Sequence, residues 1–186
     1  MDDLEIGIQA YEAGNYLEAR QILLPLAIAG NMQAQSSIAS MYDLGRGIAP
    51  DREEAIKWYR LAAQQGHPVA QHNLGELYYA QAQFEQAVEW YRKAAAQDFP
   101  FSLDALGEMY AEGRGVPQDD REAVKLYRQA ADLGFLFAQH NLAGMYREGR
   151  GVKRDLNEAE RLYQLSAAQG YSPSQTALKT FQERTV

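Results

Sequence analysis

Three histidines and a scatter of carboxylates are the residues of this chain that could bind a metal or transfer protons. His72 and His140 lie in matching Gln-His-Asn-Leu tetrapeptides, and Glu76 follows His72 by four residues. A His and a Glu at this spacing share one face of a helix and offer two zinc ligands, whereas a zinc site takes three or four. The chain has no cysteine, which excludes thiolate ligands, disulfides and a cysteine nucleophile. We therefore expect no metal, no cofactor and no enzyme activity.

A Gly-Arg-Gly motif recurs three times, at residues 45–47, 113–115 and 149–151. Glycine-rich loops bind phosphate where they join a strand to a helix. Here each motif ends a helical pattern, so a phosphate or dinucleotide loop is excluded. The copies lie 36 residues apart, or 68, which is one unit of 36 and one of 32. A fixed period of this length is typical of a solenoid, in which each unit buries its apolar face against its neighbours.

Each unit is predicted to be two helices joined by a loop. Ala, Leu, Glu, Gln, Lys and Arg dominate the sequence, and apolar residues recur every three or four positions. In residues 31–66, Gly45 is expected to end the first helix and Asp51 to cap the second. Glu54 lies three residues after Asp51 and is the expected capping-box partner. The same trio recurs in the other two copies of the motif.

The predicted fold class is all-α: a right-handed superhelix, or solenoid, of about eleven helices that forms a single repeat domain. The predicted units, in chain order, are a short hairpin at 1–30, a long hairpin at 31–66, a short hairpin at 67–98, long hairpins at 99–134 and 135–170, and a closing helix at 171–186. The short hairpins lack the Gly-Arg-Gly insertion. We expect the closing helix to act as a terminal cap.

Residues 106–116 read Leu-Gly-Glu-Met-Tyr-Ala-Glu-Gly-Arg-Gly-Val, and Tyr-Arg-Gln-Ala-Ala-Asp-Leu-Gly ends the same unit at 127–134. This pattern resembles the Sel-1-like repeat, and the short hairpins resemble tetratricopeptide repeats. The resemblance covers nearly the whole chain. It implies an adaptor or scaffold that holds other proteins, and many such proteins act in bacterial regulation, secretion or host interaction. A cysteine-rich branch associated with β-lactam binding implies nothing here, because its disulfides are absent.

The resemblance also implies that the first helix of each unit lines a concave groove where a partner binds. The residues expected to face this groove are Gln33, Ser36, Ser40, Asp43, Val69, His72, Glu76, Tyr79, Phe101, Asp104, Glu108, Glu112, Phe137, His140, Arg147 and Glu148. Near the N-terminus, Leu4, Ile8, Tyr11 and Glu12 are expected to extend the same face.

The predicted first helices are acidic. They comprise residues 1–13, 31–44, 67–80, 100–112 and 136–148, and they hold ten Asp or Glu against one Arg or Lys. An acidic wall along a groove attracts a basic segment, although solvated helices are also often acidic without any partner. We expect the groove to bind a basic or mixed basic–apolar segment of a protein, with Phe101, Phe137 and Tyr79 as anchors. The alternative for Phe101 and Phe137 is packing on the preceding hairpin.

Other features are given a structural interpretation. Trp58 and Trp90 occupy equivalent positions and are interpreted as packing between repeats. Arg46, Arg114 and Arg150 form a row along the loops, which we interpret as solvated arginines rather than an anion site. The net charge of −7 weighs against a nucleic-acid partner.

Three alternatives to a general adaptor stay open. The acidic charge and small size also suit an inhibitor or immunity-type protein that caps a basic toxin or enzyme. A hydrolase that uses groove carboxylates such as Glu76 or Glu108 is a second alternative. A monomer is expected, but self-association through an exposed end helix, at Leu178 and Phe181, is a third.

The chain has no window of 18 or more apolar residues, so a membrane span is not expected. Its acidic start, Met-Asp-Asp-Leu-Glu, lacks the basic and then apolar layout of a signal peptide. The expected location is therefore the cytoplasm.

Overall fold

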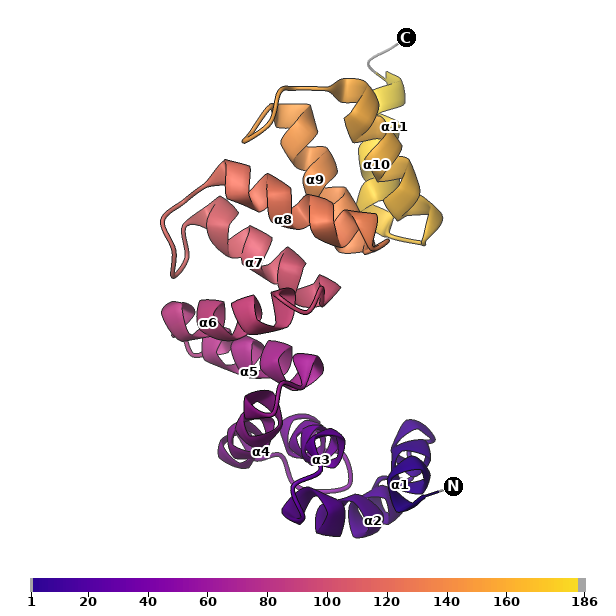
Figure 1. Cartoon of the computed structure of the whole chain (residues 1–186). Coiled ribbons are helices and arrows are strands. Elements are labelled where there is room, and N and C mark those ends of the chain that lie inside the picture. The colour runs from indigo at the N-terminus through magenta and orange to yellow at the C-terminus, as the bar shows by residue number, and fades with distance from the viewer. Residues whose placement is uncertain (1, 184–186) are drawn as a thin grey trace. The chain divides into compact units, whose positions relative to one another are not determined.

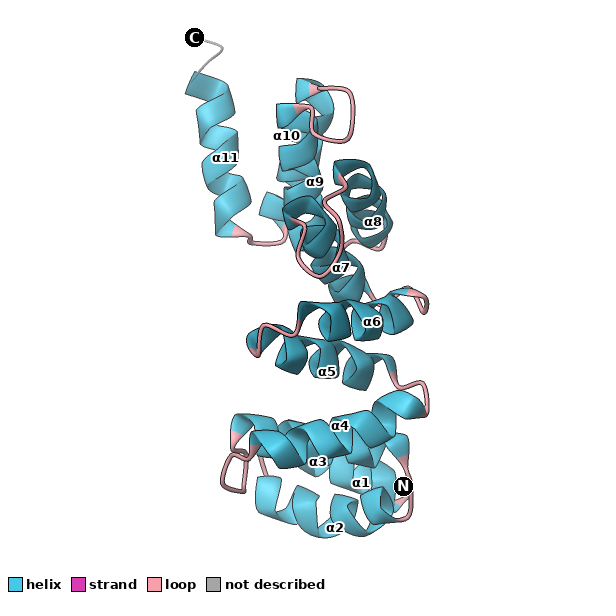
Figure 2. Ribbon diagram, turned by 90° about the vertical axis from the view of Figure 1, so that its left-hand side faces the viewer, coloured by secondary structure: helices cyan, strands magenta, loops and turns pink. Residues whose placement is uncertain are grey.

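The computed structural model describes residues 2–183, and within this range it contains eleven α-helices and no strand. The all-α class predicted from the sequence is therefore confirmed (Figure 1). The chain divides into two compact units, Met1–Gln83 and Phe84–Val186, and in each of them short loops join antiparallel helices (Figure 2). None of the described helices is long and apolar enough to cross a membrane.

The first unit contains α1 (Asp3–Glu12), α2 (Tyr16–Ile28), α3 (Met32–Leu44), α4 (Arg52–Gln64) and α5 (Pro68–Ala80). Each helix packs against the next along the chain, and α1 also contacts α3. Leu23, Ile38 and Met41 are buried among alanines that let the helices approach closely. Trp58 packs against this core, which confirms its predicted role in packing.

The second unit contains α6 (Phe84–Ala95), α7 (Pro100–Glu112), α8 (Asp120–Asp132), α9 (Leu136–Glu148), α10 (Leu156–Ala168) and α11 (Ser172–Glu183). Successive helices again pack side by side. We call α1, α3, α5, α7, α9 and α11 the first helices and the others the second helices. Tyr91, Tyr127 and Tyr163 of the second helices are buried, so these tyrosines belong to the core.

The loop after α3 shows how each long unit turns. Gly45 adopts the left-handed conformation with φ of 65°, as predicted, and the Asp51 side chain accepts hydrogen bonds from the first turn of α4. The predicted capping box is wrong, however. The backbone N–H of Asp51 donates to the carbonyl of Tyr42 at 2.9 Å, and Glu54 instead pairs with Lys57 at 2.6 Å. The two later loops repeat both departures.

The second glycine of each Gly-Arg-Gly motif lies against the preceding hairpin. A Cβ atom on Gly47 would lie 2.6 Å from Tyr16 Cβ, and one on Gly115 would lie 2.6 Å from the carbonyl of Phe84. A Cβ atom on Gly151 would likewise collide with the carbonyl of Asp120. All three have positive φ, which only glycine adopts cheaply. The motif therefore fixes how closely a loop approaches the start of the previous second helix.

The arginine between the two glycines also reaches the preceding hairpin. The interpretation as a solvated loop residue is wrong for Arg46 and Arg150, which are only partly exposed, and holds for Arg114, which is exposed. Arg46 donates to the hydroxyl of Tyr11 at 2.9 Å and lies over the rings of Tyr11 and Tyr16. Arg150 donates to the Asp120 carboxylate at 2.6 Å and to the carbonyl oxygen of Ala111. Arg114 lies over the ring of Phe84.

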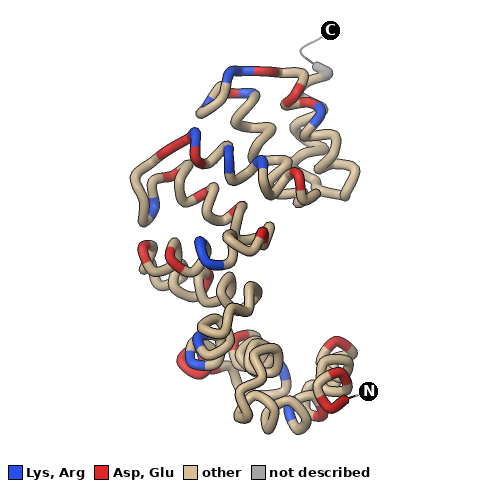
Figure 3. Tube along the Cα trace, in the orientation of Figure 1, with Lys and Arg blue, Asp and Glu red and all other residues tan. Residues whose placement is uncertain are grey.

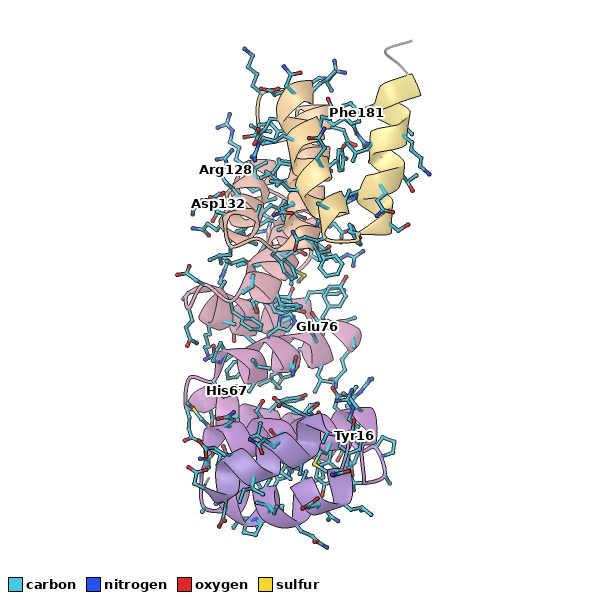
Figure 4. All side chains as sticks on the ribbon, turned by 90° about the vertical axis from the view of Figure 1, so that its right-hand side faces the viewer. Tyr16, His67, Glu76, Arg128, Asp132 and Phe181 are labelled. Carbon is cyan, nitrogen blue, oxygen red and sulfur yellow. The ribbon has the colours of Figure 1, made fainter. Side chains whose placement is uncertain are left out.

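Long polar side chains make further ties between successive hairpins. Buried Gln35 and Gln71 each donate to a carbonyl near the end of the previous second helix. Arg128 of α8, labelled in Figure 4, donates to the hydroxyl of Tyr146 on the next first helix at 2.9 Å. These bonds recur at equivalent positions in other repeats, so they hold each hairpin in register with its neighbour.

Replacing Gly115 with alanine tests the close approach of the loop. A methyl group there would collide with the Phe84 backbone and would also force an unfavourable left-handed conformation. We expect Gly115→Ala to lower the free energy of unfolding by about 2–4 kcal/mol, measured by urea denaturation.

Gly134→Ala is the matched control, because Gly134 also has positive φ but a Cβ atom there would meet no atom within 4 Å. The control should cost only about 1–2 kcal/mol, which is the conformational penalty alone. Equal losses in the two variants would contradict the inferred contact.

Candidate functional site

The first helices of the first unit border a hollow of about 310 Å³. It is lined by Ile8, Tyr11, Glu12, Gln33, Ser36, Ser37, Ser40, His67, Val69 and Asn73. A smaller hollow of about 210 Å³ shares Ile8 and Gln33 with it and extends along α1 to Leu4. We call the two together the first-helix hollow. It crosses α1, α3 and the start of α5, so three successive repeats contribute to one surface.

Only part of the predicted groove set lines this hollow. Of the predicted residues in the first unit, Gln33, Ser36, Ser40 and Val69 are among the lining residues, as are Leu4, Ile8, Tyr11 and Glu12. Asp43, His72, Glu76 and Tyr79 are not among them. Asp43, Glu76 and Tyr79 lie nearer the C-terminal ends of α3 and α5, whereas His72 directly precedes the lining residue Asn73.

Five lining residues are not in the predicted set: Glu5, Gln9, Ser37, His67 and Asn73. His67 precedes α5 as its N-cap, and its Nδ1 accepts a hydrogen bond from the backbone N–H of Ala70 at 3.2 Å. The signal in the sequence was its place before Pro68, since proline favours the first position of a helix. Ser37 and Asn73 are equivalent residues of α3 and α5, one position after Ser36 and His72.

Four hydroxyl groups, from Tyr11, Ser36, Ser37 and Ser40, line the larger hollow beside carboxylate, amide and imidazole groups. The hydroxyls of Tyr11 and Ser40 are 2.7 Å apart, and Arg46 donates to the same Tyr11 oxygen. Asn73 donates to the hydroxyl of Tyr59 at 3.1 Å. These bonds hold the lining side chains in place before any partner arrives, which reduces the entropy that binding must cost.

The second unit presents a different surface along its first helices. Phe99 stacks on Phe101 at 5.4 Å, Phe101 contacts Phe135 at 4.6 Å, Phe135 contacts Phe137 at 5.2 Å, and Phe137 contacts Tyr171 at 5.0 Å. We call these five residues the aromatic row. Phe101 and Phe137 are nevertheless 48% and 40% exposed. Both rings therefore pack against residues of their own and the following repeat, and their role as anchors for a partner stays a prediction.

Asp104 is a buried carboxylate of the predicted groove set. It is only 8% exposed, and Asn141 donates to its Oδ1 atom at 3.1 Å. Burial, with a further contribution from nearby Glu108, raises the pKa of Asp104 to about 7. Asp104 therefore carries only part of a negative charge at neutral pH.

The remaining predicted residues of the second unit are already engaged with neighbours. Glu112 forms an ion pair with Arg114 at 2.9 Å, and Arg147 pairs with Glu148 at 2.7 Å. His140 Nδ1 is 2.8 Å from the hydroxyl of Ser174, and burial lowers the pKa of His140, with a smaller contribution from Arg147. The acidic surface is therefore weaker than the count of Asp and Glu implies.

All charged residues of the first helix α1 are acidic, whereas the second helix α8 carries both acidic and basic residues (Figure 3). His72 and Glu76 of α5 approach within 3.9 Å of each other. Across residues 2–183, His, Asp and Glu side chains do not gather in groups of three or more that could hold a metal ion.

The end helix, α11, exposes less of its apolar side chains than an interface for self-association is expected to expose. Phe181, labelled in Figure 4, is half-buried and contacts the ring of Tyr163 edge-on at 5.9 Å. Leu178 is also half-buried. These two side chains contribute to the packing of α11 on α10 and offer little exposed apolar area for a second copy.

The burial of Asp104 predicts a pH-dependent stability. Its pKa is higher in the folded protein than the value of about 3.8 expected when unfolded, so the folded state binds its proton more tightly. This contribution is complete below about pH 4 and is lost as the pH rises through about 7. We expect Asp104→Asn, which keeps the bond from Asn141, to flatten the fall in stability between pH 5 and pH 8 by about 1–3 kcal/mol.

The measurement is urea unfolding followed by circular dichroism at pH 5, 6, 7 and 8. Asp132→Asn is the control, because it removes a carboxylate from an exposed position of α8 (Figure 4). The histidines also titrate in this range, so the comparison is between variant and wild type: an Asp104→Asn variant whose stability changes with pH as much as that of the wild type would rule out the assigned burial effect.

Comparison with known proteins places this arrangement in a family. The Sel1 repeat matches residues 33–67, 100–135 and 136–171, and a tetratricopeptide repeat matches residues 70–101. The Sel1 matches together cover more than half of the chain.

Solved structures share the fold. The protective antigen c5321 of uropathogenic Escherichia coli strains, described as displaying an SLR fold, is 34% identical with a TM-score of 0.89 over 98% of this chain, which spans 41% of that protein. A Sel1 repeat protein from Oxalobacter formigenes is 36% identical with a TM-score of 0.87, and the match covers 94% of this chain and 73% of that one. The immunity protein Pa5087 from Pseudomonas aeruginosa shares the fold at 21% identity and a TM-score of 0.60, over 86% of this chain and 60% of that one. Sel1 repeats match more than half of this chain, and the similarity to a solved Sel1 repeat protein extends over 94% of it. This chain therefore belongs to the Sel1 repeat family.

Proposed function

We propose that this chain is a non-enzymatic adaptor that binds a basic or mixed basic–apolar segment of a partner protein on the surface of its first helices. Sel1 repeat proteins generally mediate interactions between proteins. The observation that carries the proposal is the first-helix hollow, because one open surface draws its lining from three successive repeats. A surface of this kind suits an extended or helical segment better than a compact small molecule.

The charge on the first helices supports a basic partner. Glu12, Glu76 and Glu108 are exposed, and each lies on a first helix. Among α1, α3, α5, α7 and α9, the one Lys or Arg is Arg147, and it is paired with Glu148. Exposed carboxylates attract a cationic segment over a distance of about one Debye length, which is roughly 8–10 Å at physiological salt.

The arrangement of the carboxylates gives little support to the hydrolase alternative. Glu5 and Glu12, which line the first-helix hollow, are both exposed. A carboxylate pair that performs acid–base catalysis needs two different environments that push the pKa values apart. In the second unit, Asp104 is buried with a raised pKa, but the Asn141 side chain already occupies its Oδ1 atom.

A dedicated inhibitor would use the same surfaces in another way. It would bind one folded basic protein at a fixed stoichiometry and would not bind short peptides of the same charge. The similarity to an immunity protein concerns the fold alone, so it does not favour this alternative. The peptide experiment below separates the two functions.

Charge reversal on the first helices provides the test. We expect fluorescein-labelled 15-residue peptides of mixed Lys, Arg and Leu composition to bind the wild-type protein, with an affinity that falls as salt is raised. The triple variant Glu12→Lys, Glu76→Lys, Glu108→Lys should bind at least about tenfold more weakly, which corresponds to about 1.4 kcal/mol. Fluorescence polarisation at two salt concentrations measures both effects.

The matched control reverses three exposed carboxylates of the second helices, in the variant Glu18→Lys, Glu89→Lys, Asp132→Lys. This control changes the net charge by the same amount, so a general effect of charge would weaken both variants equally. An equal loss in the two variants, or no loss in the first, would refute the proposed surface. Binding only to one intact basic protein would favour the inhibitor.

A further inference from the structure

The first helices α7 and α9 of the second unit begin after aromatic residues, whereas α3 and α5 of the first unit begin after polar caps. Asn31 and His67 precede α3 and α5, and both side chains accept backbone hydrogen bonds there. Phe99 and Phe135 occupy the same position before α7 and α9 and make no capping hydrogen bond. Replacing a capping side chain with one that cannot accept costs about 1 kcal/mol at each helix. Helix capping therefore does not explain why phenylalanine occupies these two positions.

Packing accounts for only part of the aromatic row. Phe99 and Phe135 are half-buried, whereas Phe101 and Phe137, two residues further on, are 48% and 40% exposed. Val69 holds the equivalent position in the first unit and lines the first-helix hollow. The same position of the repeat thus faces outward in both units, and in the second unit it presents aromatic rings to solvent.

The two exposed rings lie within reach of about one turn of one kind of peptide backbone. Both contact Phe135, at 4.6 and 5.2 Å, so their centroids are less than about 10 Å apart. They are inclined to the Phe135 ring by 59° and 67°, which leaves an uneven aromatic surface. A polyproline II helix repeats every three residues at about 3.1 Å per residue, or roughly 9 Å per turn. Prolines at positions i and i+3 of such a segment can therefore lie over Phe101 and Phe137 together.

Acidic side chains beside the aromatic row define the rest of the partner. Asp104 and Glu108 follow Phe101 by three and seven residues, so all three share one face of α7. Glu108 is exposed, and Asp104 is buried beneath it with Asn141. On α9 the equivalent positions hold His140 and Gly144, so the negative charge lies on the α7 side of the row. A segment with prolines over the rings would place a basic residue against α7.

We propose that the aromatic row of the second unit binds a proline-rich segment in the polyproline II conformation, with an adjacent arginine or lysine directed at Glu108. This inference rests on the proposed function and names the chemistry of the partner at one part of the surface. Aromatic surfaces suit such segments because proline rings pack flat on them and the preformed backbone loses little entropy on binding.

The probe is the fluorescein-labelled peptide Pro-Pro-Ala-Pro-Pro-Ala-Pro-Pro-Arg-Arg, measured by fluorescence polarisation with the whole protein. We expect it to bind at least tenfold more tightly than a peptide of the same charge in which alanine replaces every proline. We expect Phe101→Ala, Phe137→Ala to weaken binding of the proline peptide at least tenfold. Both side chains are exposed, and thermal unfolding should show that the variant remains folded.

A second variant separates aromatic stacking from general apolar contact. Phe101→Leu, Phe137→Leu keeps an apolar surface, so it should retain the Lys, Arg and Leu peptides used above while losing most of its affinity for the proline peptide. Glu108→Gln should weaken binding of the arginine-containing peptide and leave a peptide that ends in two alanines unchanged.

Two outcomes overturn the inference while the proposed function stands: equal binding of the proline and alanine peptides, or proline binding that does not change in either phenylalanine variant. Failure of the protein to bind both the proline peptide and the basic–apolar peptides would overturn the inference and the proposed function together. Loss of proline-peptide binding in the alanine and leucine variants, with the other peptides retained, would establish the aromatic row as the site.

Discussion

Each helical hairpin of this chain buries its apolar face against a neighbouring hairpin. In the long repeats, the loop glycines set how closely two successive hairpins approach each other. Gly47, Gly115 and Gly151 each lie against the start of the preceding second helix. The arginine beside each glycine then contacts the same preceding hairpin. These contacts come mainly from the loops and from the starts of the second helices, so most positions on the outward face of the first helices can vary in chemistry.

The sequence was sufficient to predict the helices and their ends, because these depend on local signals that repeat with the period. Gly45 and Asp51 act at the ends of their helices as predicted. The capping box failed for a reason that local patterns do not contain: the backbone N–H of Asp51 is already bonded to the carbonyl of Tyr42. Arg46 and Arg150 were misinterpreted for a related reason. Their partners lie a whole hairpin away and differ in type, tyrosine in one case and aspartate in the other.

The candidate site was predicted less completely, because exposure and charge depend on packing. Gln33, Ser36, Ser40 and Val69 were identified from their register on the first helices. Asp104 has the same register as Ser36, yet burial changes its charge at neutral pH, which a count of carboxylates cannot show. Ion pairs have a similar effect at Glu112 and Glu148. The electrostatic attraction proposed for a basic partner therefore comes from a few exposed glutamates rather than from an acidic wall.

The two units place different chemistry at the same positions of the repeat. Where the first unit has hydroxyls and a capping histidine around a hollow, the second has phenylalanines and carboxylates. Contacts between neighbouring hairpins do not require this difference, since the buried glutamines and the arginine–tyrosine bonds recur in both units. Under the proposed function, this difference corresponds to the segment that each surface binds: a polar one at the first unit and a proline-rich, basic one at the second.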